Sequence, residues 1–430
     1  MGTPLRSFVF GHLADAHVGA WPRDAAVRRA LRESVLRAFR VVEERGCQFL
    51  LISGDLFHTP VPEPAEVAPV AAGLRRLVDR GIGAYVIYGS HDYVAHRTSW
   101  LDVLAETGIF LRAAPEAVRE EGTRWSLPFR VDPRTGAVIA GLSGRAHGLD
   151  RAYFAGLDTE AFRAAEGFKV FQFHAAIDEY LPSGLRQHLH GISRHDLPGG
   201  VDYYAGGHIH YTYEGEGPEG GLLVNPGAVF GTSLPDLENG AKGRTHQGVA
   251  IVTVEDLVPQ VEFVDTAPKE RIRVFDVDVD GRTPEEARVE LDRALAAHAG
   301  SGALIFPRVH GRLKSGTLGE LGLARTLGGD APDGSEHVHW DVRDASAGLP
   351  EPEEADASEA EARWAGGLVE DVGTQRVGLA GEAGERTARE LLRELGTGRS
   401  EGESKADYEA ARVRAGLLIL GLARTEPLGE

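Results

Sequence analysis

Cysteine and long hydrophobic runs are almost absent from this sequence of 430 residues. Its single cysteine, Cys47, excludes a disulfide framework and excludes zinc or iron–sulfur sites built from cysteine. Cys47 stands just before a short apolar segment, where a buried structural thiol is expected. No apolar run approaches the roughly 18–20 residues of a membrane span, and the segment Leu417 to Ala423 is far shorter. The N-terminus lacks the basic and apolar pattern of a signal peptide, so we expect a cytoplasmic protein without membrane association.

Positive charge is also scarce: 46 Lys and Arg stand against 65 Asp and Glu, for a formal net charge of −19. This balance argues against a nucleic-acid-binding protein, because contacts with phosphate call for a basic surface. The acidic excess is regional, however. Residues 1–200 hold 23 basic and 23 acidic residues, whereas residues 201–430 hold 23 basic and 42 acidic residues. The N-terminal half therefore has to be considered separately.

The N-terminal half alternates between predicted strands and predicted helices. Residues 7–13 read as a buried strand, and an apolar stripe at helical spacing predicts a helix from Asp24, its N-cap, to about Arg45. A strand at 49–52, a helix at 64–80 and a strand at 84–88 follow. This order predicts parallel strands covered by helices. Later strands are predicted at 137–142, 169–173, 203–205, 222–224 and 248–254.

The C-terminal half has a different organisation. A strand at 271–279, an amphipathic helix at 284–298 and a strand at 303–309 predict a small α+β domain. Residues 351–362 are acidic and lack large apolar side chains, which is typical of a solvated linker, and two helices are predicted beyond them. We expect a main domain, a small α+β domain, an acidic linker and a helical segment at residues 1–266, 267–346, 347–366 and 367–430.

Five short segments place carboxylates or imidazoles directly after predicted strands: Asp15-Ala-His17, Gly54-Asp55-Leu-Phe-His58, Gly89-Ser90-His91-Asp92, Phe173-His174 and Gly206-Gly207-His208-Ile-His210. In an extended chain, residues i and i+2 point to the same side, so an Asp-x-His or His-x-His pair can face one ion. Glycine lets the backbone turn sharply and approach a ligand closely. The carboxyl ends of strands are also where open α/β sheets bind ligands.

Nitrogen and oxygen donors without sulfur suit manganese, iron or zinc. The number of donors favours two ions over one. Two ions about 3.5–4 Å apart can clamp the attacking and the leaving oxygen of a phosphoryl displacement. Asp55 is the natural bridging carboxylate, because it lies in the middle of the series.

Each segment taken alone has an ordinary structural explanation. Asp-x-His occurs by chance, Gly-x-His-Asp is common in turns, and His-x-His fits a half-exposed strand. Their joint occurrence at strand ends favours the two-metal site. The pairs His188/His190 and His337/His339 lack glycine turns and nearby carboxylate motifs, so they are predicted to be surface or partly buried polar residues.

The five segments resemble the signature of calcineurin-like metallophosphoesterases. The longer stretches His12 to Gly19, Gly54 to His58 and Asp202 to His210 are similar to the SbcD type of DNA double-strand-break repair nuclease. The resemblance covers about residues 7–230. It implies an α/β fold of the calcineurin-like phosphoesterase type, with layered β-sheets flanked by helices, a small α+β cap domain and a helical C-terminal segment.

The resemblance also implies the roles of individual residues. One ion would bind to Asp15, His17, Asp55 and His210, and the second to Asp55, Ser90, His174 and His208. His91 would stabilise the transition state or protonate the leaving oxygen, and His58 would position the phosphate. Ser90 departs from the family, which usually has asparagine at this place. Its shorter hydroxyl either weakens the second metal site or is an accepted variant, and we favour the accepted variant.

The function implied is a manganese-dependent DNA repair nuclease with 3′→5′ exonuclease activity on duplex DNA and endonuclease activity on single strands. The resemblance implies a homodimer that works with an SMC-like ATPase of the SbcC type. The sequence has no G-x-x-x-x-G-K-[ST] segment, so the chain itself should not hydrolyse ATP. The C-terminal helices are the expected docking place of the ATPase, although packing within the chain explains their apolar stripe equally well.

Two alternatives remain open. One is a metallophosphoesterase that acts on nucleotides or other small phosphodiesters, and the other is a DNA-end-binding scaffold subunit with a weakened metal site. Charge alone makes five residues candidate phosphate contacts: Arg97, Arg186, Arg194, Arg312 and Lys314. For each of them an ordinary solvated side chain is the more common interpretation.

Overall fold

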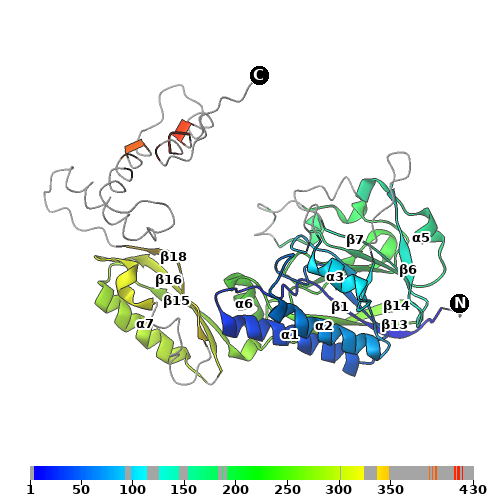
Figure 1. Ribbon diagram of the computed structural model, residues 1–430, viewed down its shortest axis with the longest axis horizontal. Helices are drawn as coiled ribbons and strands as arrows, with labels where there is room; N and C mark the ends of the chain where they lie inside the picture. Colours follow the sequence, from blue (N-terminus) through cyan, green and yellow to red (C-terminus); the bar gives the residue numbers. More distant parts are fainter. Residues whose placement is uncertain are drawn as a thin grey trace. The chain divides into compact units, whose positions relative to one another are not determined.

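In the computed structural model, the described residues are 4–92, 98–113, 125–144, 154–182, 186, 191–300, 302–323 and 337–347, with scattered helical residues between 387 and 419. Residues Met1–Gly348 form one compact unit and Leu349–Glu430 a second (Figure 1). The predicted acidic linker lies outside the described residues. Of the predicted C-terminal helices, the structure describes enough to show Arg412 paired with Glu394 at 2.7 Å.

The first sheet has the strand order β14-β13-β1-β2-β3-β4. Its parallel strands are β1 (Phe8–Leu13), β2 (Phe49–Ser53), β3 (Gly83–Ile87) and β4 (Leu111–Arg112). Two antiparallel strands continue the sheet beyond β1: β13 (Gly248–Glu255) and β14 (Val258–Asp265). The parallel pairing predicted for the N-terminal strands is confirmed.

The second sheet has the order β11-β12-β10-β9-β7-β6. These strands are β6 (Phe129–Val131), β7 (Val138–Leu142), β9 (Lys169–Phe173), β10 (Tyr203–Ala205), β11 (Tyr213–Glu216) and β12 (Leu222–Asn225). The four central strands are parallel, and β6 and β11 form antiparallel edges. A separate small pair joins β5 (Trp125–Ser126) to β8 (Leu157–Asp158). The sequence patterns predicted the central strands β7, β9, β10 and β12 of this sheet, and β13 of the first sheet, but not the edge strands β6 and β11.

Helices cover the outer faces of these sheets. Figure 1 shows α1 (Ala25–Glu44) and α2 (Pro64–Asp79) along one face of the first sheet. The other α-helices that the structure describes in this part are α3 (Trp100–Glu106), α5 (Glu160–Ala164) and α6 (Leu234–Ala241). Because side chains alternate along a strand, Leu50 and Ile52 pack toward the helices, whereas Phe49 and Leu51 pack toward the second sheet.

A core rich in aromatic residues joins the two sheets. It contains Phe8, Phe10 and Phe49 of the first sheet with Phe168, Val170 and Tyr203 of the second. The rings of Phe10 and Phe49 stack at 4.7 Å, and Tyr203 meets Phe10 edge-on at 5.1 Å. Strands buried on both faces carry continuous apolar runs, which explains the SFVF segment at the N-terminus. The layered arrangement of sheets flanked by helices is that of the predicted fold class.

The third sheet follows these two layers in the chain. Its parallel strands are β15 (Ile272–Asp278), β16 (Leu304–Arg312), β17 (His337–Val338) and β18 (Asp341–Ser346). The helix α7 (Pro284–His298), which has the predicted bounds, begins with a capping box formed by Thr283 and Glu286. A core of its own contains Val277, Leu291 and Val309. The four-part division of the chain remains a prediction.

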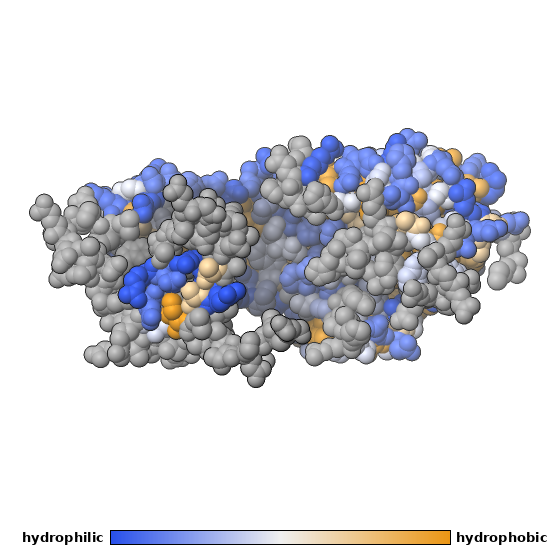
Figure 2. Space-filling view, turned by 90° about the horizontal axis from the view of Figure 1, so that it is seen from above, coloured by the Kyte–Doolittle hydropathy of each residue, from blue (hydrophilic) through white to orange (hydrophobic). Residues whose placement is uncertain are grey.

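Few large apolar side chains of the described residues are exposed to solvent. The most exposed are Val61 in the loop before α2, Val258 of β14 and Val289 of α7. Figure 2 shows hydrophilic residues over most of the coloured part of one face, with small hydrophobic patches between them. Single exposed apolar residues are normal for a folded protein. No helix among the described residues has both the length and the apolar character needed to cross a membrane.

Candidate metal centre

The loops that follow five strands bring all the predicted site residues together. Asp15 and His17 follow β1, Asp55 and His58 follow β2, Ser90 and His91 follow β3, His174 follows β9, and His208 and His210 follow β10. The carboxyl ends of parallel strands from both sheets therefore meet at one place. Residues nearly 200 positions apart touch there: His17 Nε2 lies 3.2 Å from His210 Nε2.

The loops after β1 and β2 run side by side beyond the sheet. The backbone N–H of Asp15 donates to the carbonyl of Gly54 at 3.1 Å, and that of His17 donates to the carbonyl of Asp55 at 2.9 Å. These bonds continue the parallel register of β1 and β2. These two bonds therefore hold Asp15, His17 and Asp55 close together at the edge of the site.

Backbone strain is concentrated in these loops. Asp15, His17, Asp55 and His208 have φ values of 50°, 45°, 52° and 89°. They are half of the eight non-glycine residues with positive φ in the described part of the chain. Such conformations cost on the order of 1–3 kcal/mol each and persist where the surrounding structure enforces them. Their clustering marks this edge as the functional one.

Glycine is required where the loops approach one another. A Cβ atom at Gly89 would lie 2.1 Å from Oδ1 of Asp55. One at Gly54, whose φ is 90°, would lie 2.3 Å from Nδ1 of His174. The close approach predicted for the glycine-containing segments is therefore present between the loops themselves.

Asp55 lies at the centre of the cluster. Its Oδ2 is 3.6 Å from His17 Nε2, 3.2 Å from His174 Nε2 and 3.4 Å from the hydroxyl of Ser90. Its Oδ1 accepts the backbone N–H of His91 at 2.8 Å. One carboxylate thus stands between the residues predicted for the first ion and those predicted for the second, which is the arrangement a bridging ligand needs.

In the described part of the chain, three groups of donor atoms, each within 4.8 Å of one another, could hold an ion: Asp15/His17/His210, Asp15/Asp55/His174 and His17/His58/His91. The first group lies within the set predicted for the first ion, and the second group combines Asp15 of that set with Asp55 and His174 of the other. His208 belongs to none of these groups. Its ring lies 5.1 Å from that of His174, and its backbone N–H donates to Asp15 Oδ2 at 2.9 Å. The structure places His208 and Ser90 beside the site, and their ligation remains a prediction.

Buried atoms without hydrogen bonds provide a test of whether the site suits a cation. Asp15 Oδ1 and His17 Nδ1 are buried and have no hydrogen-bond partner among the described residues. Buried polar atoms are nearly always satisfied, so such atoms need an explanation. Carboxylate oxygen and imidazole nitrogen without sulfur suit a divalent transition metal. The residues present therefore fit divalent ions.

The carboxylates of the site differ in their electrostatics. Burial raises the pKa of Asp15 to about 6, although His174 and His210 oppose the shift. Burial would raise the pKa of Asp55 too, but the neighbouring His174 and His17 hold it well below its usual range. Asp55 is therefore the permanent anion of the cluster.

The imidazoles balance this negative charge. Burial favours the neutral form of His174, but Asp55 and Asp15 raise its pKa to about 10. Burial likewise opposes charge on His210, and Asp236, Asp15 and Asp55 raise its pKa to about 9. Without ions, protons on these two rings supply the positive charge of the site.

The affinity for divalent ions is expected to rise with pH between about 6 and 9. An imidazolium must lose its proton before it binds a cation, and His174 and His210 carry theirs below their raised pKa values. Each ion that displaces one proton should bind about tenfold more tightly per pH unit. Calorimetric titration with Mn²⁺ in buffers of different ionisation enthalpy measures the protons released, and release of none at pH 7 would contradict the expectation.

Asp236 contributes to the site but was not predicted. Its Oδ2 lies 2.9 Å from Nδ1 of His210 and accepts the backbone N–H groups of Thr232 and Ser233. A carboxylate on the second ring nitrogen fixes the orientation of a metal-binding histidine. The Ser-x-x-Asp pattern of Ser233 and Asp236 signals the start of α6, but nothing in the sequence indicates contact with His210.

Asp92 ends the Gly89-Ser90-His91-Asp92 segment, and no role was predicted for its side chain. Its carboxylate accepts the backbone N–H groups of Leu56, Phe57 and Gly89 at 3.3, 3.1 and 3.0 Å. Burial, followed by the charge of Asp55, raises the pKa of Asp92 to about 7. Asp92 therefore ties the loop after β2 to the loop after β3.

His12 links the two sheets beneath the site. Its Nε2 lies 3.1 Å from the carbonyl of Gly206, so this nitrogen carries the proton and Nδ1 accepts the hydroxyl of Tyr203 at 2.9 Å. Burial lowers the pKa of His12 to about 3, which keeps the ring neutral. The loop that leads to His208 is thereby attached to β1.

The candidate phosphate contacts receive no direct support. Arg186 donates to the carbonyl of Leu181 at 2.9 Å, and Arg194 donates to that of Glu216 at 3.0 Å. Arg97 and the pair His188/His190 lie outside the described residues.

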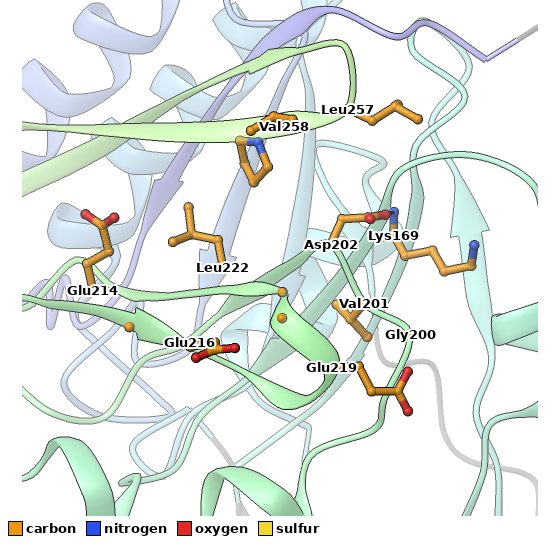
Figure 3. A pocket seen from close by; sticks show the side chains of 14 residues that line it. Lys169, Gly200, Val201, Asp202, Glu214, Glu216, Glu219, Leu222, Leu257 and Val258 are labelled. Atoms are coloured by element: carbon orange, nitrogen blue, oxygen red, sulfur yellow. Dashed lines mark hydrogen bonds between the residues drawn. The ribbon is translucent and has the colours of Figure 1, made fainter.

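A hollow of about 750 Å³ lies apart from the metal centre, and none of the predicted site residues lines it. Figure 3 shows its lining, which includes the carboxylates of Asp202, Glu214, Glu216 and Glu219 and the amine of Lys169. An excess of carboxylates repels phosphate. This hollow is therefore no candidate for a nucleic-acid site.

Comparison with known proteins agrees with this geometry. Residues 8–212 match the family model described as calcineurin-like phosphoesterase. The chain is 25% identical over 298 residues to the DNA double-strand break repair protein Mre11 of Archaeoglobus fulgidus, covering 64% of this chain and 62% of the relative. The Mre11 protein of Methanococcus maripaludis is 24% identical over 205 residues, covering 47% and 51%.

A third relative carries a different name. The uncharacterized metallophosphoesterase YhaO of Bacillus subtilis is 24% identical over 219 residues, which cover 48% of this chain and 49% of the relative. The chain thus spans between about half and three-fifths of the length of these curated relatives.

Proposed function

We propose that this chain is a metal-dependent phosphodiesterase that cleaves DNA, because residues 8–212 match the family model of calcineurin-like phosphoesterases. The observation that carries the proposal is the position of Asp55 between the two predicted donor sets. The names of the Mre11 relatives support DNA as the substrate.

Two divalent ions, which we propose to be manganese, would share Asp55. The first would also be held by Asp15, His17 and His210, and the second by Ser90, His174 and His208. When bound, such ions polarise a phosphate ester and lower the pKa of a water molecule that attacks phosphorus. Asp236 and Asp92 would keep the ligands in place through the contacts described above.

His91 and His58 would act on the substrate. His91 is exposed, and its Nδ1 donates to the carbonyl of His58 at 2.9 Å, so Nε2 is the ring nitrogen left for the leaving oxygen. The two rings stack at 5.0 Å. Burial and the proximity of His91 lower the pKa of His58, which favours a neutral ring that donates a hydrogen bond to phosphate.

The proposal extends to the type of cleavage, the oligomeric state and the partner of the chain. We propose 3′→5′ exonuclease activity on duplex DNA, endonuclease activity on single strands, and action as a homodimer with an SMC-like ATPase of the SbcC type. Residues 267–346 would help to position DNA, and residues 367–430 would bind the ATPase. Because the half of the chain that holds most of the site is electrically balanced, DNA binding should depend on the ions and the partner.

Cleavage of single-stranded DNA, duplex DNA and bis(p-nitrophenyl) phosphate with Mn²⁺ or with EDTA tests the proposal. We expect cleavage of DNA that requires Mn²⁺ and a loss of about 10²–10⁴-fold in His91→Ala, since His91 would supply acid–base catalysis. His246→Ala is the matched control, because His246 stacks on Phe263 outside the donor groups.

The alternatives predict different results. Hydrolysis of the small diester alone would identify a small-molecule phosphoesterase. Binding of DNA ends without cleavage, in protein shown to contain its ions, would identify a scaffold subunit. An unchanged rate in His91→Ala would remove His91 from the mechanism.

A further inference from the structure

Two histidines outside the metal centre contact a carboxylate that precedes them by more than 300 residues. His337 Nε2 contacts Asp24 Oδ1, and His339 Nδ1 lies 2.5 Å from Asp24 Oδ2. The Asp24 side chain is only 4% exposed. The prediction that His337 and His339 are surface or partly buried polar residues agrees with their side-chain exposures of 16% and 29%, but their contact with Asp24 was not predicted.

Both oxygens of the Asp24 carboxylate take part in this contact. Asp24 is the N-cap residue of α1, as predicted, but its side chain makes no capping hydrogen bond. Each of its two oxygens faces one imidazole instead. His337 and His339 are two positions apart at β17, so both rings point to the same side of the strand. The third sheet thus reaches the beginning of α1.

Aromatic packing surrounds the same contact. The ring of Trp21 meets that of His339 edge-on at 5.2 Å and lies 5.8 Å from that of Phe306 in β16. The indole N–H of Trp21 donates to the carbonyl of Gly231 at 3.0 Å. Trp21, with a φ of 62°, therefore holds the loop before α1 between the third sheet and the chain near α6.

A second polar contact lies on α6. Arg308 of β16 binds Glu238 at 2.9 Å and Asp276 of β15 at 2.9 Å. The same helix carries Asp236, which touches His210. The third sheet is therefore attached to two elements that also touch predicted metal ligands: α6 and the loop that runs from His17 to Asp24.

We propose that Asp24, His337 and His339 form a joint that fixes the third sheet to the phosphoesterase domain and positions the loop that carries Asp15 and His17. A buried carboxylate that loses its hydrogen-bond donors is strongly unfavourable, so the three side chains act as a unit. Asp24 is a positioning residue, because it touches the loop and not the reacting atoms. The effect on the loop rests on the proposed metal-binding function, whereas the attachment of the sheet does not.

Hydrogen–deuterium exchange of the full chain tests the attachment. In Asp24→Asn we expect exchange to rise about tenfold at the amides of Ala20, Asp24 and His339, which are hydrogen-bonded in the structure. The rise on both sides of the joint is the diagnostic result. Asp278→Asn is the matched control, since Asp278 of β15 pairs with His310 of β16, an Asp–His pair that lies inside the third sheet.

A double-mutant cycle gives the sharper test. The double variant His337→Gln/His339→Gln should show the same pattern, and adding Asp24→Asn to it should increase exchange little further, because residues that act as a unit are not additive. Additive effects, or increased exchange near His339 with none near Ala20, would overturn the joint. If Asp24→Asn fails to fold, the double histidine variant still tests the joint through the same exchange measurement.

Manganese binding tests the positioning role separately. We expect Asp24→Asn to bind Mn²⁺ about tenfold more weakly although no ligand is altered, by analogy with outer residues that orient metal ligands. Wild-type affinity in this variant, together with increased exchange, would overturn the positioning role. Absence of Mn²⁺ binding in the wild-type chain would instead refute the proposed function and leave the exchange result as the test of the joint.

Discussion

Asp55→Asn is expected to lower the rate of metal-dependent phosphodiester hydrolysis by on the order of 10³-fold or more. The substitution keeps the shape of the side chain and removes the charge that lies between His17 and His174. A neutral amide cannot bridge two cations, so the variant should also retain less bound metal. Initial rates with saturating Mn²⁺ and metal content by mass spectrometry measure both effects.

The matched control for Asp55→Asn is Asp256→Asn. Asp256 undergoes the same chemical change, but its side chain is 83% exposed and pairs with Arg6 on the surface. Its removal should leave rate and metal content unchanged, because exposed ion pairs contribute little. Full metal content in Asp55→Asn, with a rate within tenfold of the wild type, would exclude Asp55 as the bridging ligand.

Gly89→Ala is expected to disable the site although it removes no functional group. The new Cβ would lie 2.1 Å from Oδ1 and 2.5 Å from the backbone nitrogen of Asp55, so the loops after β2 and β3 must separate. A displacement of about 1 Å at a catalytic group costs about 10²-fold in rate. Overpacking should also lower the free energy of unfolding by about 1–3 kcal/mol. Urea denaturation and initial rates measure these changes.

Gly319→Ala controls for the loss of glycine itself. The nearest atom to a Cβ at Gly319 is Oγ1 of Thr317, at 3.7 Å, which is ordinary contact. We expect a change within about 0.5 kcal/mol in the free energy of unfolding and no loss of activity. If Gly89→Ala behaved like this control, the close packing of Gly89 on Asp55 would not be needed for function.

Most of the metal centre could be predicted because its signals are local. A segment such as Asp15-Ala-His17 after an apolar strand contains both the donors and the geometry that aligns them. Parallel order then brings the ends of β1, β2 and β3 to one edge. The edge strands β11 and β14 were missed because their residues are partly buried or exposed, without a continuous buried apolar run.

The supporting residues could not be predicted in the same way. Asp236 has the local pattern of a helix cap, and its contact with His210 exists only because the loop after β10 returns past α6. His12 lies inside an apolar strand, where a buried histidine has no distinguishing sequence context. The residues that Asp236 and His12 contact lie in other segments of the sequence and, for His12, in the second sheet.

The sequence by itself indicated most of the strand–loop–helix order, the residues predicted to be metal donors and the glycines that let their loops come close. These properties follow from spacing and side-chain chemistry within short segments. The tertiary structure placed Asp55, which the sequence had singled out as the bridging candidate, between the two predicted donor sets. It alone decided that Asp236 contacts His210, that His12 links the two sheets, and that Asp24 faces His337 and His339. Such contacts depend on how separate sheets stack and cross, and no local pattern of residues contains that information.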